Sequence, residues 1–409
     1  MKNFVSNEGY KKEKIFFEKG KGSLVFSKNK KFIDLSCGSG TLLLGHSSKI
    51  FKSSLRDFLK LNISNFSSPN KYAVLFAQNL KKIYPQFSKF VFCNSGAESN
   101  IKAIRLARAI TNKNLIISVS GSWHGSIDQF LFNSDYKNRP VKISDGVDPN
   151  IKKNIIYIPY NDEKKSLKIL NKYKKKASCV IIEPIQGCLP TAEGINYLKF
   201  LNNYCKKNNL ILLFDEIITG VRVNCSSVQN ELNIKSDIST FGKVLGGGLP
   251  IGILAFSNKI YQKLLKKKKK VYFGGTFSGN ALSMYLANKT LTFILKNKKK
   301  IFNKLEYISH TFENDLNTFI KKNNLNARVF RYKSILRIVF SKKIIKNRLE
   351  RDLLEKKHLL NKIKFVNFLK NNAIRFPGNG VILLSCSINK KQLKYTLEKI
   401  KVALKKFSR

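Results

Sequence analysis

Short apolar runs alternate with amphipathic segments between about residues 70 and 295. Several runs, such as LILLF at residues 210–214, are continuously apolar rather than alternating, which is typical of strands buried on both faces. The expected strands cover residues 90–93, 115–119, 155–158, 179–183, 210–214 and 251–256, and the expected helices cover residues 99–109, 163–174 and 195–208. This alternation predicts an α/β fold with a mainly parallel sheet and right-handed crossovers.

Both flanks have a different pattern. Short strands are expected around residues 23–26 and 32–35, and a long helix over 280–295 leads into a mixture of helices and short strands, the latter at 327–332, 335–340 and 380–386. This mixture is typical of a smaller α+β domain, which we expect to be built from both termini. The expected division is an N-terminal segment (1–60) that joins the small domain, a large domain (61–298) and a C-terminal small domain (299–409).

Composition excludes several classes of protein. The chain has 409 residues, of which 43% are hydrophobic and 11% aromatic, so it is neither a disordered basic tail nor a collagen-like chain. Its 77 Lys and Arg against 25 Asp and Glu give a net charge of 77 − 25 = +52. The excess is mostly Lys, accompanied by many Asn, Ile and Phe residues, which indicates compositional drift rather than a phosphate-reading surface. We therefore expect no nucleic-acid partner, and solvent-exposed lysine runs at 266–270 and 298–300.

The cysteines and the apolar runs bear on the compartment. Seven scattered cysteines without a CxxC pair argue against a disulfide framework and a zinc ribbon, and we expect no metal site. The N-terminus lacks a signal-peptide pattern, and no run approaches the roughly 18 apolar residues of a membrane span. A cytoplasmic protein without a membrane partner is the expectation.

Candidate chemistry follows the expected strands, because ligands of open α/β sheets bind beyond the carboxyl ends of the strands. Residues 94–99 (NSGAES) could bind a phosphate at a helix N-terminus, or simply cap that helix. Residues 122–125 (SWHG) contain the only tryptophan, which could stack on a flat ligand or belong to the core. Residues 183–187 (EPIQG) end a strand with a carboxylate, which alone is a weak signal.

Three further clusters lie nearer the middle of the chain. Residues 214–217 (FDEI) place acidic groups at a strand end without the His or Cys partners of a metal site. Residues 242–250 (GKVLGGGLP) set a lysine beside three glycines in an order that is not a P-loop, so Lys243 is either a Schiff-base nucleophile or a surface lysine. Residues 274–280 (GGTFSGN) open the next helix and are a second candidate phosphate contact.

Taken together, these clusters suit pyridoxal 5′-phosphate. They supply a phosphate cradle, a stacking aromatic, a carboxylate that can keep the pyridine nitrogen protonated, and a lysine that can form a Schiff base and move a proton. No single cluster is specific, whereas the whole set in this order is.

The motifs resemble those of the class III, fold-type-I PLP-dependent aminotransferases, and within them the glutamate-1-semialdehyde 2,1-aminomutase group. The similarity runs from about residue 32 to 288 and is densest in stretches such as VIIEPIQG, LLFDEIITGVRV and STFGKVLGGGLPIG. The pairing of ITGVRV after Asp-Glu with GKxxGGGxP is highly specific. The resemblance implies a large domain with a mainly parallel seven-stranded sheet beside a smaller α+β domain.

The resemblance also assigns roles to single residues. Lys243 would be the Schiff-base lysine, and Asp215 would bind the pyridine nitrogen of the cofactor. Trp123 takes the position of the stacking aromatic, more often Tyr or Phe, with His124 beside it. Ile217 would pack against the opposite face of the ring.

The remaining assignments concern the phosphate. Ser95, Gly96 and Ala97 would hold it, although the family usually has Thr where Ala97 stands. Gly275 and Thr276 would contact it as well, with Thr276 reaching the phosphate of the neighbouring subunit. The resemblance therefore implies a homodimer with active sites at the interface.

The departures from the family concern the substrate. Residues 1–35 contain no arginine, although aminomutases usually bind the substrate carboxylate with one there. Residues 36–40 (SCGSG) and 380–386 (GVILLSC) also differ from the family pattern, whereas 144–150 (SDGVDPN) lies where the aminomutase has its gating loop.

Two enzymatic functions therefore remain open. The first is an aminotransferase that moves an amino group between a small-molecule donor and a small aldehyde or ketone through Lys243, and the missing arginine favours it. The alternative is a true glutamate-1-semialdehyde aminomutase, whose intramolecular transfer gives 5-aminolevulinate for tetrapyrrole biosynthesis. A nucleic-acid-binding protein that has lost catalysis is disfavoured, because Lys243, Asp215 and Thr276 are all present.

Overall fold

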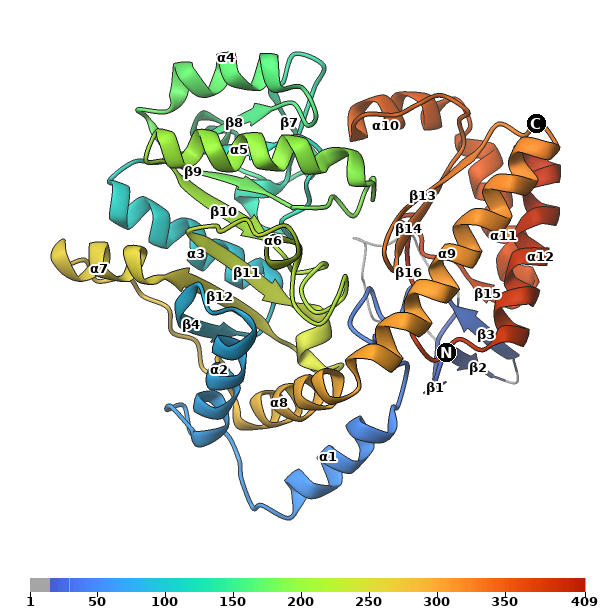
Figure 1. The fold of residues 1–409 in the computed structure, drawn as a ribbon, viewed down its shortest axis with the longest axis horizontal. Helices are drawn as coiled ribbons and strands as arrows, with labels where there is room; N and C mark the ends of the chain where they lie inside the picture. The colour runs from blue at the N-terminus through green and yellow to red at the C-terminus, as the bar shows by residue number, and fades with distance from the viewer. Residues whose placement is uncertain (1–14, 29, 409) are drawn as a thin grey trace.

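The computed structural model describes residues 15–28 and 30–408, which form a larger and a smaller body (Figure 1). The helix α9 (Lys298–Lys322) belongs to both. Ile301 and Leu305 in its first turns pack into the core of the larger body, whereas Phe312 and Leu316 pack into the core of the smaller one. One continuous helix therefore fixes the two bodies to each other.

The larger body is built on a sheet that has seven strands in the described part of the chain. Their order is β4 (Phe87–Cys93), β12 (Gly252–Ser257), β11 (Ile238–Gly242), β10 (Ile211–Asp215), β9 (Ala177–Ile182), β5 (Leu115–Val119) and β8 (Ile155–Ile158). Strand β12 is antiparallel to both neighbours, and the other pairs are parallel. The carboxyl ends of the other strands consequently meet at one edge, as the sequence pattern predicted.

Helices cover both faces of this sheet, which explains the continuous apolar runs. In β9, Ile181 packs in one cluster with Ile104 of α3, while its neighbour Val180 packs in another with Leu198 of α5. The helices of this body are α1 (Lys49–Leu59), α2 (Lys71–Ile83), α3 (Gly96–Thr111), α4 (Glu163–Tyr173), α5 (Ile195–Lys207), α6 (Val228–Glu231), α7 (Asn258–Lys266) and α8 (Ala281–Lys296), and a hairpin joins β6 (Phe132–Ser134) to β7 (Pro140–Lys142). Among the described residues, no helix is long and apolar enough to span a bilayer.

The smaller body combines segments from the two ends of the chain. Its strands are β1 (Lys19–Lys21), β2 (Leu24–Ser27), β3 (Lys30–Asp34) and β15 (Ile374–Arg375) in one sheet, and β13 (Arg328–Tyr332), β14 (Ile335–Val339) and β16 (Val381–Leu383) in another. Its further helices are α10 (Arg348–Lys356), α11 (Leu359–Asn371) and α12 (Lys390–Phe407). Ile33 and Leu35 at the end of β3 share a core with Phe312 and Ile400. The domain boundaries expected at residues 60 and 298 stay predictions.

All six strands expected in the sheet are present, but β11 was missed. Its sequence, ISTFG, contains two hydroxyl residues, so it lacks the apolar run that marks a buried strand. Both hydroxyls are buried and hydrogen-bonded: Ser239 Oγ accepts from Gln229 Nε2 at 2.8 Å, and Thr240 Oγ1 donates to Asn100 Oδ1 at 2.7 Å. The sequence pattern also missed α1 and α2.

The lysine runs lie on the surface, as expected. Every residue of 266–270, at the end of α7, is exposed, and so is every residue of 298–300, at the start of α9. Both runs therefore end or begin a helix without entering either core.

Leu35→Ala tests whether β3 is an integral part of the smaller body. Leu35 is buried in that core, and removing a buried leucine side chain costs about 2–5 kcal/mol. Leu360→Ala on the exposed face of α11 should change stability by less than about 0.5 kcal/mol. Urea unfolding followed by circular dichroism compares the two variants, and equal stability would show that β3 is dispensable to the core.

Candidate active site

Five of the clusters predicted from sequence meet at the carboxyl edge of the sheet. Residues 95–97 follow β4, residues 122–125 follow β5, and Glu183 follows β9. Asp215 is the last residue of β10, and Lys243 comes directly after β11. The parallel direction of these strands explains why the clusters lie together, because the polypeptide leaves each strand at the same edge of the sheet.

Asp215 is buried and its carboxylate is held by three donors. Its Oδ2 lies 2.8 Å from Nδ1 of His124 and accepts from Asn100 Nδ2 at 2.9 Å, while Oδ1 accepts from the Ile217 backbone N–H at 3.1 Å. The Asn100 amide also donates to the carbonyl of His124 at 2.9 Å. A buried carboxylate needs such partners, and here they also fix its orientation.

Lys243 has an unusual backbone and an unusual amine. Its φ of 45° lies in the left-handed region, which is costly for a lysine and marks a position held by its surroundings. Burial lowers the pKa of its amine, and the charge of Arg222 lowers that pKa further, whereas Asp215 and Glu183 oppose the shift. A lysine with a lowered pKa carries more free amine near neutral pH and is a better nucleophile.

Glu183 fixes the loop that carries Trp123. Its Oε1 accepts from the backbone N–H of Trp123 at 2.7 Å, and its Oε2 accepts from that of Gly187 at 3.2 Å. Burial and the nearby Asp215 raise the pKa of this carboxyl. The Trp123 side chain itself is exposed, so its indole face is free to stack on a ligand.

Ile217 packs closely against two glycines, Gly96 and Gly242, at this edge of the sheet. A Cβ on Gly96 would lie 2.5 Å from Cδ1 of Ile217, so a larger residue there would push the isoleucine side chain aside. A Cβ on Gly242 would lie 3.7 Å from Cγ2 of the same isoleucine, which places Ile217 between the start of α3 and Lys243. The loop after β5 touches α3 as well, because a Cβ on Gly125 would meet Ala97 Cβ at 2.8 Å.

Ser95 is the N-terminal cap of α3. Its Oγ accepts from the Glu98 N–H at 3.1 Å, and the amides of Gly96 and Ala97 lie in the first turn, where helical amides have no partner inside the helix. The positive end of the α3 dipole therefore faces the edge that holds Asp215 and Lys243, which suits an anion.

Gly275 and Thr276 are not brought to these residues within one chain. Both are exposed, and the carbonyl of Thr276 accepts from Asn65 Nδ2 at 3.0 Å. Ser278, in the same loop, accepts from Lys102 Nζ at 3.4 Å. Their contact with the cofactor stays a prediction that needs a second subunit.

The sequence reasoning missed Asn100 and undervalued Glu183. Asn100 lies on the apolar stripe of α3, in register with Ala103, Ile104 and Ala107, and is fully buried. The signal that could have identified Asn100 is a polar residue at a position where the helical pattern calls for an apolar one.

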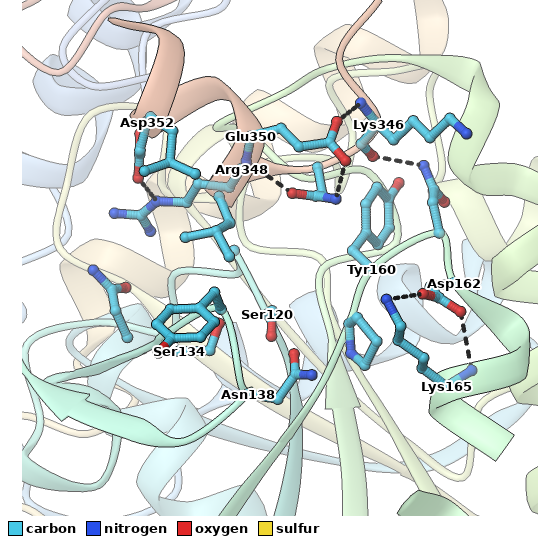
Figure 2. A pocket seen from close by; sticks show the side chains of 18 of the residues that line it. Ser120, Ser134, Asn138, Tyr160, Asp162, Lys165, Lys346, Arg348, Glu350 and Asp352 are labelled. Carbon is cyan, nitrogen blue, oxygen red and sulfur yellow. Dashed lines mark hydrogen bonds and ion pairs between the residues drawn. The ribbon is translucent and has the colours of Figure 1, made fainter. Parts of the chain in front are cut away.

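A separate cavity of about 590 Å³ opens further along the same edge (Figure 2). It lies between the ends of β5 and β8, the β6–β7 hairpin and α10, and Ser120 at the end of β5 lines it. Four of its charged side chains are paired with one another, Asp162 with Lys165 at 3.2 Å and Arg348 with Asp352 at 3.2 Å. Neither Lys243 nor Asp215 lines this cavity, so the chemistry lies outside it.

Comparison with known proteins agrees with this geometry. The family model for class-III aminotransferases matches residues 5–404. The chain is 31% identical to glutamate-1-semialdehyde 2,1-aminomutase of Methanosphaera stadtmanae, over 97% of this chain and 93% of the relative. It is 32% identical to the aminomutase of Wigglesworthia glossinidia brevipalpis, over 94% and 89%.

Solved structures share the fold at lower identity. An omega-transaminase from Sphaerobacter thermophilus superposes with a TM-score of 0.87 at 19% identity, covering 96% of this chain and 91% of that one. A glutamate-1-semialdehyde aminomutase from Pseudomonas aeruginosa PAO1 gives 0.86 at 16% identity, covering 96% and 88%. The chain belongs to the class-III aminotransferase family and is a PLP-dependent enzyme with the fold-type-I architecture.

Proposed function

We propose that the protein is an aminotransferase of the aminomutase-like group, with Lys243 as the residue that binds the cofactor covalently. The observation that carries the proposal is the juxtaposition of a buried lysine of lowered pKa with a carboxylate, Asp215, whose orientation is fixed by His124 and Asn100. A lysine on the surface would not be buried next to a carboxylate that is itself hydrogen-bonded on both oxygens.

The residues present fit pyridoxal 5′-phosphate. When bound, this cofactor withdraws electrons from the carbon that carries the amino group. Asp215 would keep a proton on the ring nitrogen, and the start of α3 at Gly96 would hold the phosphate. Trp123 and Ile217 would contact the ring.

Lys243 then has two tasks. Its free amine would hold the cofactor covalently, and its Nζ would serve as the base that takes a proton from the substrate carbon and returns it. Both tasks need an unprotonated amine, which the lowered pKa supplies. The short η4 segment (Lys243–Gly246) and the glycines after it keep the backbone close-packed here.

We propose further that two copies of the chain complete each site. Thr276 is exposed on a loop that also exposes Tyr272 and Phe277, and large apolar residues such as Leu59 and Phe66 are exposed near the start of the larger body. Exposed apolar side chains of this size are typical of a surface that another subunit covers. Thr276 would reach the phosphate held by the partner.

Transfer between two molecules is favoured over the intramolecular reaction. The aminomutase relatives support the alternative, glutamate-1-semialdehyde 2,1-aminomutase, and so does the SDGVDPN segment at 144–150. The absence of arginine from residues 1–35 weighs more, because it removes the usual carboxylate-binding group of the mutase. A cytoplasmic location and small-molecule donors and acceptors complete the proposal.

Lys243→Ala should abolish covalent binding of the cofactor. After borohydride reduction of the native protein, peptide mass spectrometry should find the pyridoxyl group on the peptide that contains Lys243, and the variant should carry none. Activity should fall by at least about a hundred- to ten-thousand-fold, because the proton acceptor is lost as well. The exposed Lys259→Ala is the matched control, and a pyridoxyl group on another lysine would contradict the proposal.

Asp215→Asn should leave the fold intact and lower the rate of amino transfer by about a hundred-fold or more, because a neutral amide no longer holds the ring-nitrogen proton. Steady-state kinetics measure the loss, and the reduced pyridoxyl-Lys243 peptide shows that the cofactor still binds. Native activity in this variant would refute the role of Asp215.

The type of transfer is tested with an added amino donor. A transaminase releases one keto acid from the donor for each acceptor that is aminated, so we expect equal amounts of both products by chromatography. A pure mutase instead converts its single substrate without consuming any donor. Donor-independent turnover would therefore replace the proposed function by the alternative.

A further inference from the structure

Arg222 is a fully buried guanidinium without an acidic partner. It lies in the turn after β10, where Nη1 donates to the carbonyl of Leu384 at 3.0 Å and to Ser334 Oγ at 3.3 Å. Its Nη2 donates to the carbonyl of Gly40 at 2.9 Å and lies 4.0 Å from Cys37 Sγ. Among the described residues, Nε has no hydrogen-bond partner and no carboxylate lies within ion-pair distance of the side chain.

A buried cation of this kind is expensive unless it is paired. Arg337, which is also buried, pairs with Glu355 at 3.3 Å. The thiol beside Arg222 supplies no negative charge, because burial raises the pKa of Cys37 to about 12. The positive charge of Arg222 is therefore uncompensated inside the protein.

Gly40 connects Arg222 to Lys243. Its carbonyl accepts from Arg222, and a Cβ at this position would lie 3.6 Å from Cδ of Lys243 and 2.8 Å from Cδ1 of Leu383. The turn 36–40 thus rests on the guanidinium on one side and against the stem of Lys243 on the other, and the segment 380–386 contacts both the guanidinium and Gly40. These are two of the segments in which the sequence departs from its family.

Three charged groups act on the Lys243 amine. Asp215 and Glu183 favour its protonated form, and Arg222 favours the free amine, in the same direction as burial. Without Arg222, no charged group would oppose the rise that Asp215 and Glu183 cause in the pKa of the Lys243 amine.

We propose that Arg222 is a positioning residue for Lys243: it holds the 36–40 turn against the stem of the lysine, ties that turn to Leu384, and places a fixed positive charge near the amine. The inference rests on the proposed role of Lys243 and adds to it the group that keeps the amine unprotonated.

Arg222→Met tests the charge. The full-length chain, freed of cofactor, is labelled with an amine-selective acylating reagent over a range of pH, and the labelling of each lysine is measured by peptide mass spectrometry. Removing the cation should raise the pKa of Lys243 by about one unit, which lowers its labelling at pH 7.5 about ten-fold. Arg222→Lys keeps the charge, so its Lys243 should label within about two-fold of the native rate while the protein melts at a lower temperature.

Arg337→Met is the matched control, since it also removes a buried arginine but one that does not act on Lys243. Its Lys243 should label at the native rate. Equal labelling of Lys243 in Arg222→Met and native protein would overturn the proposal, and so would slow labelling in Arg222→Lys.

If the Met variant does not fold by circular dichroism, Arg222→Gln, which can still donate to Gly40, decides by the same ten-fold criterion. The pyridoxyl-Lys243 peptide tests the proposed function separately. Failure of the proposed role of Arg222 can therefore be distinguished from failure of the proposed function.

Discussion

The contact between His124 and Asp215 fixes most of the site. Its 2.8 Å distance joins two buried side chains that follow different strands, so neither the loop after β5 nor the end of β10 can move without exposing an unpaired charge. Asn100 adds α3 to the same network, and Thr240, which donates to Asn100, adds β11. One carboxylate therefore positions four segments: the loop after β5, the end of β10, α3 and β11.

This dependence explains what the sequence could predict. Clusters such as residues 95–97 and 122–125 are each contiguous, and each directly follows an apolar strand, so their place at the carboxyl edge follows from the parallel fold. Strand β11, which leads to Lys243, could not be predicted, because its buried hydroxyls are stabilised by side chains of other elements: Gln229 of α6 for Ser239, and Asn100 of α3, 140 residues away, for Thr240. Asn100 was missed for the same reason: its partner, Asp215, lies 115 residues away.

The net charge of +52 is compatible with this site because the lysine runs and the site occupy different places. The runs at 266–270 and 298–300 are exposed at helix ends, where cations repel one another weakly across water. Around Lys243 the charges are few and buried, and there each acts strongly. Charge counted over the whole chain therefore says little about the electrostatics of the reaction.

The strand-end cluster around Asp215 and the segments around Arg222 differ in how they are built. The strand-end cluster consists of short motifs that touch one another beyond the ends of the strands, and the chain is 31% identical to an aminomutase relative. Arg222 joins residues 36–40, Ser334 and Leu384, and the Leu384 N–H also donates to the carbonyl of Ser334 at 3.3 Å. Because the guanidinium binds backbone carbonyls of Gly40 and Leu384, the side chains of these two segments can vary while the frame is kept. The cluster around Asp215 is thus held together by side chains, whereas the two segments that depart from the family pattern are held by their backbone.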